Sequence, residues 1–122
     1  MFERVDGLIT FLYYKDLEKA ASFYQKTMGF ELVIDQSWAK IYKVTDRAHI
    51  GIVDEKRGYH KASSAKPVMV TLVVPNVDAW HRYLKHKGAK LLTEPHDIRE
   101  LGIRAFLLED PEGYVLEIQR FF

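Results

Sequence analysis

The sequence contains no cysteine, no long apolar stretch and almost no net charge. Without cysteine, the chain has neither a disulfide framework nor a thiolate nucleophile. No stretch approaches the roughly 18 consecutive apolar residues of a membrane-spanning helix, so we expect no membrane contact. The chain has 122 residues, 48% hydrophobic and 29% charged, which is enough to pack one core and is typical of a single domain.

The charges give no indication of a nucleic-acid partner. The formal net charge is +1, and lysine and arginine are spread along the chain instead of forming a basic stripe. Residues 1–6 include early acids and lack the apolar core of a signal peptide. We therefore expect a cytoplasmic protein that binds neither nucleic acid nor a membrane.

What the sequence does contain is a repeated order of strands and helices. Residues 8–14 are β-rich, and Asp16 is suited to cap a helix whose apolar residues follow helical spacing. The same order starts again at residues 68–74, with Asn76 in the place of Asp16. A polar linker, residues 55–66, separates the repeats. The pattern predicts an α+β fold of two βαβββ modules, residues 6–54 and 67–122. The later strands are expected at residues 30–34, 38–44, 48–53, 90–93, 102–108 and 114–120.

The segment from Asp110 to Ile118 predicts a tight turn followed by the last strand. Pro111 and Gly113 suit the second and fourth positions of such a turn. Alternation along the strand then leaves Glu117 among apolar neighbours. Because burying an unpaired carboxylate is costly, Glu117 is a candidate catalytic or ligand-binding residue. The alternative is a sheet with one solvated face, on which Glu117 is simply in water.

With these features the chain resembles the vicinal oxygen chelate superfamily, which includes glyoxalase I, bleomycin-resistance proteins, fosfomycin-resistance proteins and extradiol dioxygenases. The resemblance covers nearly the whole chain and implies one glyoxalase/bleomycin-resistance-like domain over residues 1–122. It also implies a curled mixed sheet around a ligand cavity, with helices on the outer face, and a homodimer. The segments that carry it are Lys15-Asp16-Leu17-Glu18, Phe23-Tyr24, Met28-Gly29-Phe30, Val74 to Asp78, Asp110-Pro111-Glu112-Gly113-Tyr114 and Leu116-Glu117-Ile118.

Metal-dependent members of that superfamily place ligands at four corresponding positions, one on the first and one on the last strand of each module. In this sequence the resemblance assigns these positions to Ile9, Gly51, Met69 and Glu117. Three of these residues cannot supply a hard or borderline ligand, and a divalent site usually takes at least three protein ligands. His49, expected on the face of Gly51, and Glu117 are the only candidate ligands. We therefore expect no metal cofactor.

Alternation also predicts which side chains share the face of Glu117. The prediction assumes a two-residue loop, Pro111-Glu112, which sets Glu117 opposite Phe106 and brings Arg104 within diagonal reach. The same alternation predicts that the Ile41 side chain lies on the opposite face, toward the helix. Alternatively, the aromatic rings belong to the core or a dimer interface, Arg104 forms an ion pair or is solvated, and His49 is a hydrogen-bonded, partly buried histidine. The predicted ligand-binding residues are Phe11, Tyr13, Trp38, Tyr42, His49, Arg104, Phe106 and Glu117.

Three functions are compatible with this face. The first is metal-independent binding of a small, partly hydrophobic molecule in an aromatic-lined cavity. The second is a metal-free enzyme, such as a lyase or isomerase, that uses Glu117 with His49 or Arg104 as acid and base groups. The third is a metal-dependent lyase or isomerase with His49 and Glu117 as ligands. We rank the binding protein first.

Overall fold

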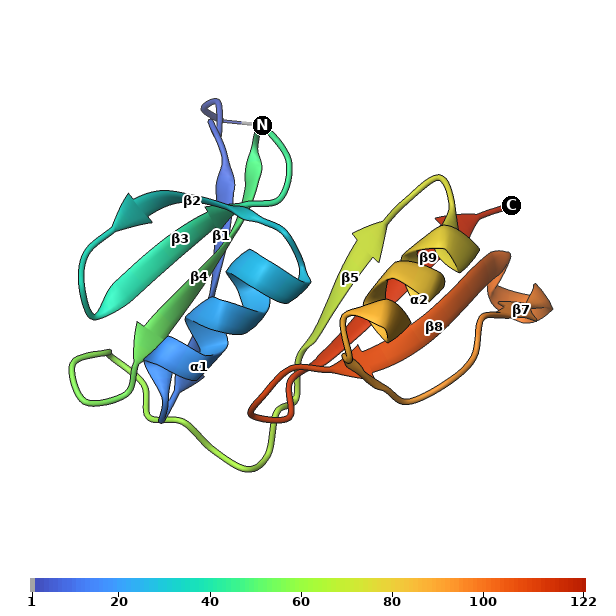
Figure 1. Cartoon of the computed structure of the whole chain (residues 1–122). Coiled ribbons are helices and arrows are strands. Elements are labelled where there is room, and N and C mark those ends of the chain that lie inside the picture. Colours follow the sequence, from blue (N-terminus) through green and yellow to red (C-terminus); the bar gives the residue numbers. More distant parts are fainter. Residues whose placement is uncertain (1) are drawn as a thin grey trace. The chain divides into compact units, whose positions relative to one another are not determined.

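The structure is a computed structural model that describes residues 2–122. The chain forms two compact units. Unit 1 runs to Ser63, and unit 2 comprises Ser64–Phe122. Each unit has its own sheet and its own helix, and each is described by itself (Figure 1).

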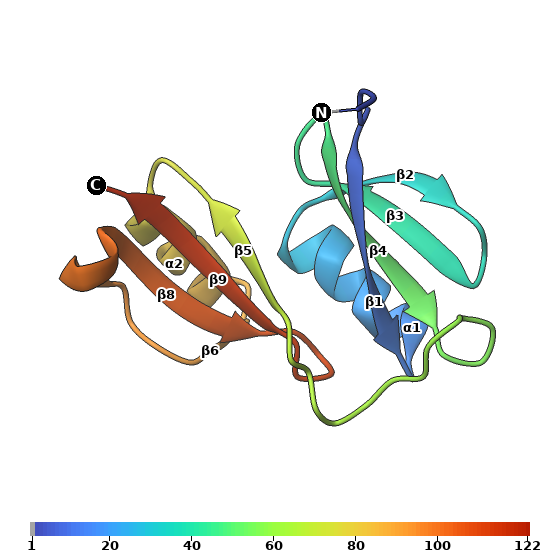
Figure 2. The same ribbon diagram turned by 180° about the vertical axis from the view of Figure 1, so that it is seen from behind.

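Unit 1 is a four-stranded sheet with one helical segment on one face. The strands lie in the order β1-β4-β3-β2; β1 and β4 are parallel, and the other neighbouring pairs are antiparallel (Figure 2). Since parallel neighbours need a crossover, the helix between β1 and β2 covers one face of the sheet. The elements are β1 (Leu8–Tyr14), α1 (Leu17–Ser22), the π-helical turn η1 (Phe23–Thr27), β2 (Glu31–Asp35), β3 (Ala39–Lys43) and β4 (Ala48–Asp54).

Unit 2 repeats this arrangement with one addition. Its strands follow the order β5-β9-β8-β6, with β5 parallel to β9, and the short strand β7 also pairs with β8. The elements are β5 (Met69–Val73), α2 (Val77–His86), β6 (Lys90–Leu91), β7 (His96–Ile98), the 3-10 turn η2 (Arg99–Leu101), β8 (Ile103–Glu109) and β9 (Val115–Phe121). Within residues 2–122, no helix is long and apolar enough to cross a membrane.

Both helices begin at the predicted cap residues. The Asp16 carboxylate accepts a hydrogen bond of 3.1 Å from the Lys19 backbone N–H. The Asn76 side-chain oxygen accepts one of 3.0 Å from the Ala79 N–H. Each bond satisfies a backbone donor that the first helical turn leaves without a partner. The α+β class and the two βαβββ units are therefore confirmed.

The core of unit 1 lies between the sheet and its helical segment. Tyr14, Tyr24 and Tyr42 are fully buried there. The Tyr14 hydroxyl donates to the Tyr24 hydroxyl over 3.0 Å, and the Tyr42 hydroxyl lies 3.5 Å from the carbonyl oxygen of Ala21 in α1. Burial raises the pKa of the Tyr42 phenol. Tyr42 thus faces the helix, and the prediction that it shares the face of Glu117's counterpart, Gly51, is wrong.

The core of unit 2 has the same plan. Phe106, Leu108, Leu116 and Ile118 are fully buried. The Phe106 ring contacts the His81 ring of α2 edge-on, with 4.9 Å between ring centroids. His81 is only 7% exposed, because it occupies the buried stripe of α2 with Val77 and Leu84.

The register of the last hairpin differs from the prediction by one residue. The Asp110 N–H donates to the Tyr114 carbonyl, so three residues, 111–113, form the loop instead of two. Glu117 therefore pairs with Leu107, and Phe106 pairs with Ile118. A shift of one residue turns every side chain to the other face. Phe106 and Arg104 consequently lie on the helix side, opposite to the face predicted for them.

We expect Phe106→Ala to lower the free energy of unfolding by about 3–5 kcal/mol, since it empties a fully buried site. Leu107→Ala, on the other face and partly exposed, is the matched control and should cost clearly less. Urea denaturation of both variants measures the difference. Equal costs would contradict the register described above.

Candidate binding pocket and open sheet faces

The face of the unit 1 sheet that lies away from its helix consists of three rows of paired residues. Ile9, His49 and Lys43 form the first row, Phe11, Gly51 and Ile41 the second, and Tyr13, Val53 and Ala39 the third. His49 thus shares the face of Gly51, as predicted, whereas Ile41 belongs to this face and not to the helix side.

In the middle row, the aromatic ring of Phe11 covers Gly51. A Cβ atom added to Gly51 would overlap with Cδ1 and Cε1 of Phe11. The Phe11 ring therefore lies directly on the Gly51 backbone, which only glycine permits here. The ring also remains 42% exposed on its other side.

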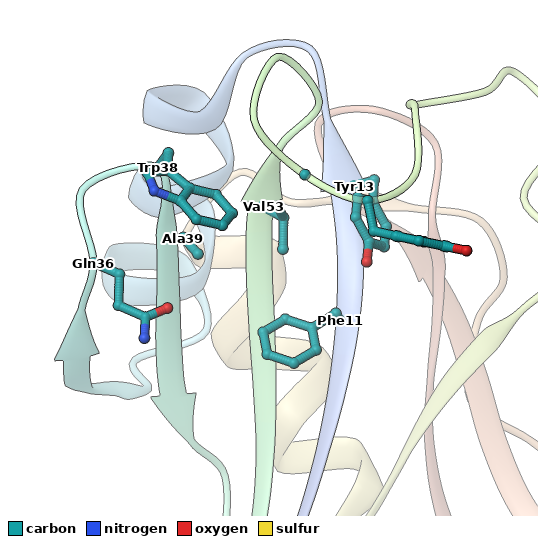
Figure 3. A pocket seen from close by; sticks show the side chains of 8 residues that line it. Phe11, Tyr13, Gln36, Trp38, Ala39 and Val53 are labelled. Atoms are coloured by element: carbon teal, nitrogen blue, oxygen red, sulfur yellow. The ribbon is translucent and has the colours of Figure 1, made fainter.

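A pocket of about 200 Å³ lies at the third row (Figure 3). Val53 and Ala39 form its floor, with Trp38 on one side and Tyr13 on the other. Strands β1, β3 and β4 supply much of the wall, and two turns of unit 1 supply the rest. The lining residues are Phe11, Tyr13, Gln36, Trp38, Ala39, Val53, Gly58 and Tyr59.

The first of these turns joins β2 to β3 and positions Trp38. Ser37 adopts a left-handed conformation with φ of 72°, and its N–H donates to the Asp35 carboxylate over 2.9 Å. This bond, together with Lys40, lowers the pKa of Asp35. Because the turn lies between the strands, Trp38 does not follow their alternation and projects toward the pocket.

The second turn follows β4 and folds over the sheet. The Gly58 N–H donates to the Asp54 carbonyl over 2.9 Å. A Cβ on Gly58 would lie 2.6 Å from Val53 Cγ1 and 3.0 Å from Tyr13 Cε1, so this glycine allows the turn to lie on the sheet. The His60 ring packs edge-on against Tyr13 at 5.2 Å. Part of the segment expected to be a solvated linker is therefore a wall of the pocket.

The corresponding face of unit 2 is more polar. Thr71 of β5 pairs with Glu117 of β9, and its hydroxyl donates to the Glu117 carboxylate over 3.0 Å. Glu117 is partly exposed, between Thr71 and Leu107. The two modules align Asp16 with Asn76, so the Thr71–Glu117 pair of unit 2 corresponds to the Phe11–Gly51 pair of unit 1.

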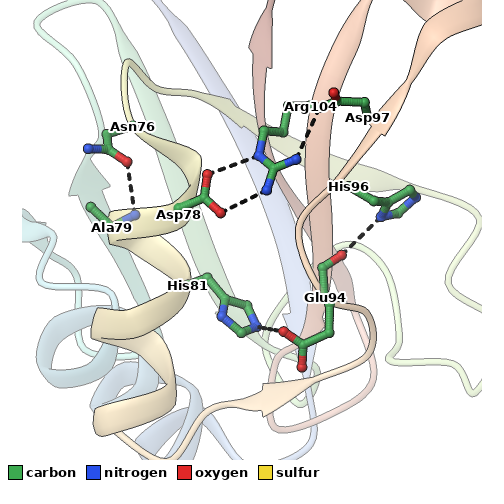
Figure 4. A network of polar contacts seen from close by, with 8 residues as sticks. All are labelled: Asn76, Asp78, Ala79, His81, Glu94, His96, Asp97 and Arg104. Carbon is green, nitrogen blue, oxygen red and sulfur yellow. Dashed lines mark hydrogen bonds and ion pairs between the residues drawn. The ribbon is translucent and has the colours of Figure 1, made fainter.

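Arg104 is held on the helix side of unit 2 by two carboxylates (Figure 4). Its Nε and Nη2 donate to the two oxygens of Asp78, each over 2.9 Å, and its Nη1 donates to Asp97 over 3.0 Å. The ion pairs raise the pKa of Arg104, and the hydrogen bonds from Arg104 lower the pKa of Asp78. Arg104 thus ties α2 and β7 to β8 and does not reach toward Glu117.

A second contact in Figure 4 involves the buried His81. Its Nε2 lies 3.4 Å from a Glu94 carboxylate oxygen, but the geometry is not that of a hydrogen bond. Glu94 is largely exposed, and its carbonyl contacts Nδ1 of His96 over 2.9 Å.

Of the predicted ligand-binding residues, Phe11, Tyr13 and Trp38 line the pocket. His49 and Glu117 lie on the open faces of their own units, outside the pocket lining. Tyr42, Arg104 and Phe106 face the helices. The prediction did not include Gln36, Gly58 and Tyr59, which belong to turns whose course alternation does not describe.

The residues do not fit the metal chelate implied by the resemblance. Ile9 has no donor atom, Met69 offers only a soft thioether sulfur, and the space beside Gly51 contains the Phe11 ring. The pairing partners of Gly51 and Glu117 on the first strands are Phe11 and Thr71. Within residues 2–122, no three His, Cys, Asp or Glu side chains gather as a possible metal site.

Comparison with known proteins gives one family match for this chain. A sequence profile of the Glyoxalase/Bleomycin resistance protein/Dioxygenase superfamily matches residues 7–118. No curated protein sequence matches the chain closely enough to count as a relative.

Several solved structures are similar in fold. TioX from Micromonospora sp. ML1 is 20% identical, with a TM-score of 0.78 over 95% of this chain and 98% of its own. A glyoxalase/bleomycin resistance protein/dioxygenase from Nocardioides is 17% identical, with a TM-score of 0.82 over 100% of this chain and 87% of its own. A lactoylglutathione lyase from Agrobacterium tumefaciens is 20% identical, with a TM-score of 0.76 over 93% and 91%. At these identities the likeness shows the fold alone.

We expect Gly51→Ala to lower the free energy of unfolding by about 1–3 kcal/mol, because the added methyl group displaces the Phe11 ring. In a Phe11→Ala background the same substitution should cost much less, since the ring is gone. Chemical denaturation of the two single variants and the double variant tests this coupling. Independent, additive effects would contradict the contact.

The Asp78–Arg104 ion pair should make stability depend on pH. Because the pKa of Asp78 is lowered in the folded state, its stabilising contribution is complete above the unfolded value, about 3.9, and is lost as the pH falls through the folded value. Asp78→Asn should therefore be less stable than the wild type at neutral pH, with a difference that closes below about pH 4. Urea midpoints measured against pH test this, with Asp46→Asn, 92% exposed, as control. A difference that persists undiminished in acid would contradict it.

Proposed function

The chain belongs to the Glyoxalase/Bleomycin resistance protein/Dioxygenase superfamily, and on that premise we propose that it binds a small, partly hydrophobic molecule in the pocket of unit 1, without a metal ion. The observation that carries the proposal is the pocket itself. It has four aromatic lining residues, Phe11, Tyr13, Trp38 and Tyr59, and a polar amide at Gln36. Mostly apolar walls with a few polar groups are typical of small-molecule sites.

The size of the pocket supports a small ligand. An apolar protein cavity of about 150 Å³ accommodates benzene, so a pocket of about 200 Å³ suits a molecule with one or two fused rings. Part of a larger ligand could extend from it into solvent, because Tyr59 at its edge is 92% exposed.

The walls are held in place before any ligand arrives. Trp38 is oriented by the Asp35–Ser37 turn, and Gly58 seats the second turn on Val53 and Tyr13. A preformed site loses less conformational entropy on binding than a site that must be ordered. Metal independence is supported by the side chains at the chelate positions, three of which offer no hard or borderline ligand atom.

An enzyme that uses Glu117 is the second candidate. The observation that favours it is the Thr71 hydroxyl, which orients a partly exposed carboxylate on the open face of unit 2. Arg104 has no part in this candidate, because its guanidinium is bound to Asp78 and Asp97.

The two tryptophans provide the test of the binding proposal. Trp38 lines the pocket and Trp80 lies on α2 in unit 2, so their indole N–H signals report on different places. In proton–nitrogen correlation spectra, with Trp80→Phe for assignment, a panel of neutral one- and two-ring aromatic compounds should shift the Trp38 signal and leave that of Trp80 in place. Trp38→Ala should weaken binding by at least about tenfold, the loss of a major aromatic contact. Binding should persist in EDTA.

The same samples distinguish the two candidates. A binding protein returns every compound unchanged after prolonged incubation. Conversion of a compound, lost in Glu117→Gln, would favour the enzyme. A panel in which no compound perturbs Trp38, or binding that survives Trp38→Ala undiminished, would overturn the proposed pocket.

A further inference from the structure

We propose that the pocket of unit 1 selects planar aromatic molecules that carry an anionic group, with Arg57 at the rim as the residue that recognises the anion. This inference rests on the proposed function, because it names the ligand class of the same pocket. It differs from a site for cationic compounds, which would bring a second positive charge close to Arg57.

The shape of the pocket favours a flat ring system. Its side walls are the rings of Trp38 and Tyr13, and the Phe11 ring and the Val53 side chain border the space between them (Figure 3). Aromatic faces and edges bind other π-systems in stacked or edge-on arrangements that add to simple area burial. The volume, about 200 Å³, suits one or two fused rings and little more.

Among residues 2–122, those that line this space include no acid. The two nearest acids along the chain are engaged elsewhere: Asp35 accepts from the Ser37 N–H and from Lys40 Nζ, and Asp54 accepts from the Lys56 N–H over 2.9 Å. A cation in the pocket would therefore gain no partner carboxylate, and the like charge of the Arg57 guanidinium beside Trp38 would oppose it.

A cation, Arg57, lies beside one wall of the pocket, although it is not among the lining residues. The Arg57 guanidinium carbon is 5.5 Å from the centroid of the Trp38 ring, over its face. The turn places it there, since the Arg57 N–H donates to the Asp54 carbonyl over 3.1 Å. Within residues 2–122, no carboxylate lies within ion-pair distance of Arg57, and its side chain is exposed. Its planar donors suit a carboxylate or another oxyanion.

The combination gives a ligand with two parts. The ring system enters the apolar pocket, and the anionic substituent remains at the rim, where Arg57 can reach it and water still solvates it. Keeping the charge at the rim avoids the desolvation cost of a buried ion. Because the contact is exposed, we expect it to select among ligands of equal shape more than to supply most of the affinity.

Three probes of matched shape test the inference: naphthoate, naphthamide and naphthylmethylammonium, substituted at the same ring position. Isothermal titration calorimetry should rank naphthoate tightest, the amide intermediate and the ammonium weakest, with about a three- to tenfold preference for the anion over the amide. At about 1 M NaCl, where the Debye length is about 3 Å, the preference should shrink toward one.

Arg57→Gln should abolish the preference of the carboxylate over the amide, measured as the ratio of the two dissociation constants in the same variant. Arg47→Gln is the matched control, because Arg47 is an exposed arginine of the same unit whose guanidinium donates to the Asp6 carbonyl, outside the pocket. It should retain the wild-type ratio.

The outcomes distinguish a failure of the proposed pocket from a failure of the proposed ligand class. If none of the three probes binds, the proposed function fails. If naphthamide binds at Trp38 but the ammonium binds as tightly as the carboxylate, or if Arg57→Gln preserves the ratio, the pocket stands and the anionic ligand class is overturned.

Discussion

The parallel pairing of the first and last strands of each unit is the constraint on which the other features depend. In unit 1, β1 lies beside β4, and in unit 2, β5 lies beside β9. This pairing requires a crossover helix, and the caps at Asp16 and Asn76 start that helix immediately after the first strand. Once the helix covers one face, the side chains that alternate along the strands are divided between a buried core and an open face. The register therefore decides which residues can meet a ligand at all.

The two units keep the same core plan but differ on their open faces. At one corresponding pair of positions, unit 1 has the Phe11 ring seated on Gly51, whereas unit 2 has the Thr71 hydroxyl bound to the Glu117 carboxylate. The first pair has no polar side-chain group, and the second retains a charge with a donor beside it. The apolar character of unit 1 extends into its pocket, where two turns close the space above the strands. The chemistry of the pocket thus depends on turns as much as on the sheet.

Turn length explains where prediction of the faces failed. A two-residue loop at Pro111-Glu112 would set Phe106 opposite Glu117, but Gly113, with φ of 91°, belongs to a loop one residue longer. That single residue turned Phe106 and Arg104 toward the helix. The prediction for β3 treats Trp38 as part of the strand, so that Trp38 and Tyr42 share one face. Trp38 instead lies in the turn before the strand, which begins at Ala39. Tyr42 therefore faces the helix, although Trp38 reaches the pocket.

The sequence by itself determined the α+β class, the repeat of two βαβββ units and the helix starts, because these depend on local features: apolar periodicity, cap residues and the positions of glycine. It also showed that three of the four chelate positions lack hard or borderline ligand atoms, since that follows from residue identity. Only the tertiary structure decided which strand faces look toward the helices, that Arg104 is bound by Asp78 and Asp97, and that residues 54–59 fold over the sheet to bring Arg57 beside Trp38. These outcomes depend on register and on contacts between distant residues. A loop longer or shorter by one residue is enough to exchange the two faces of a strand.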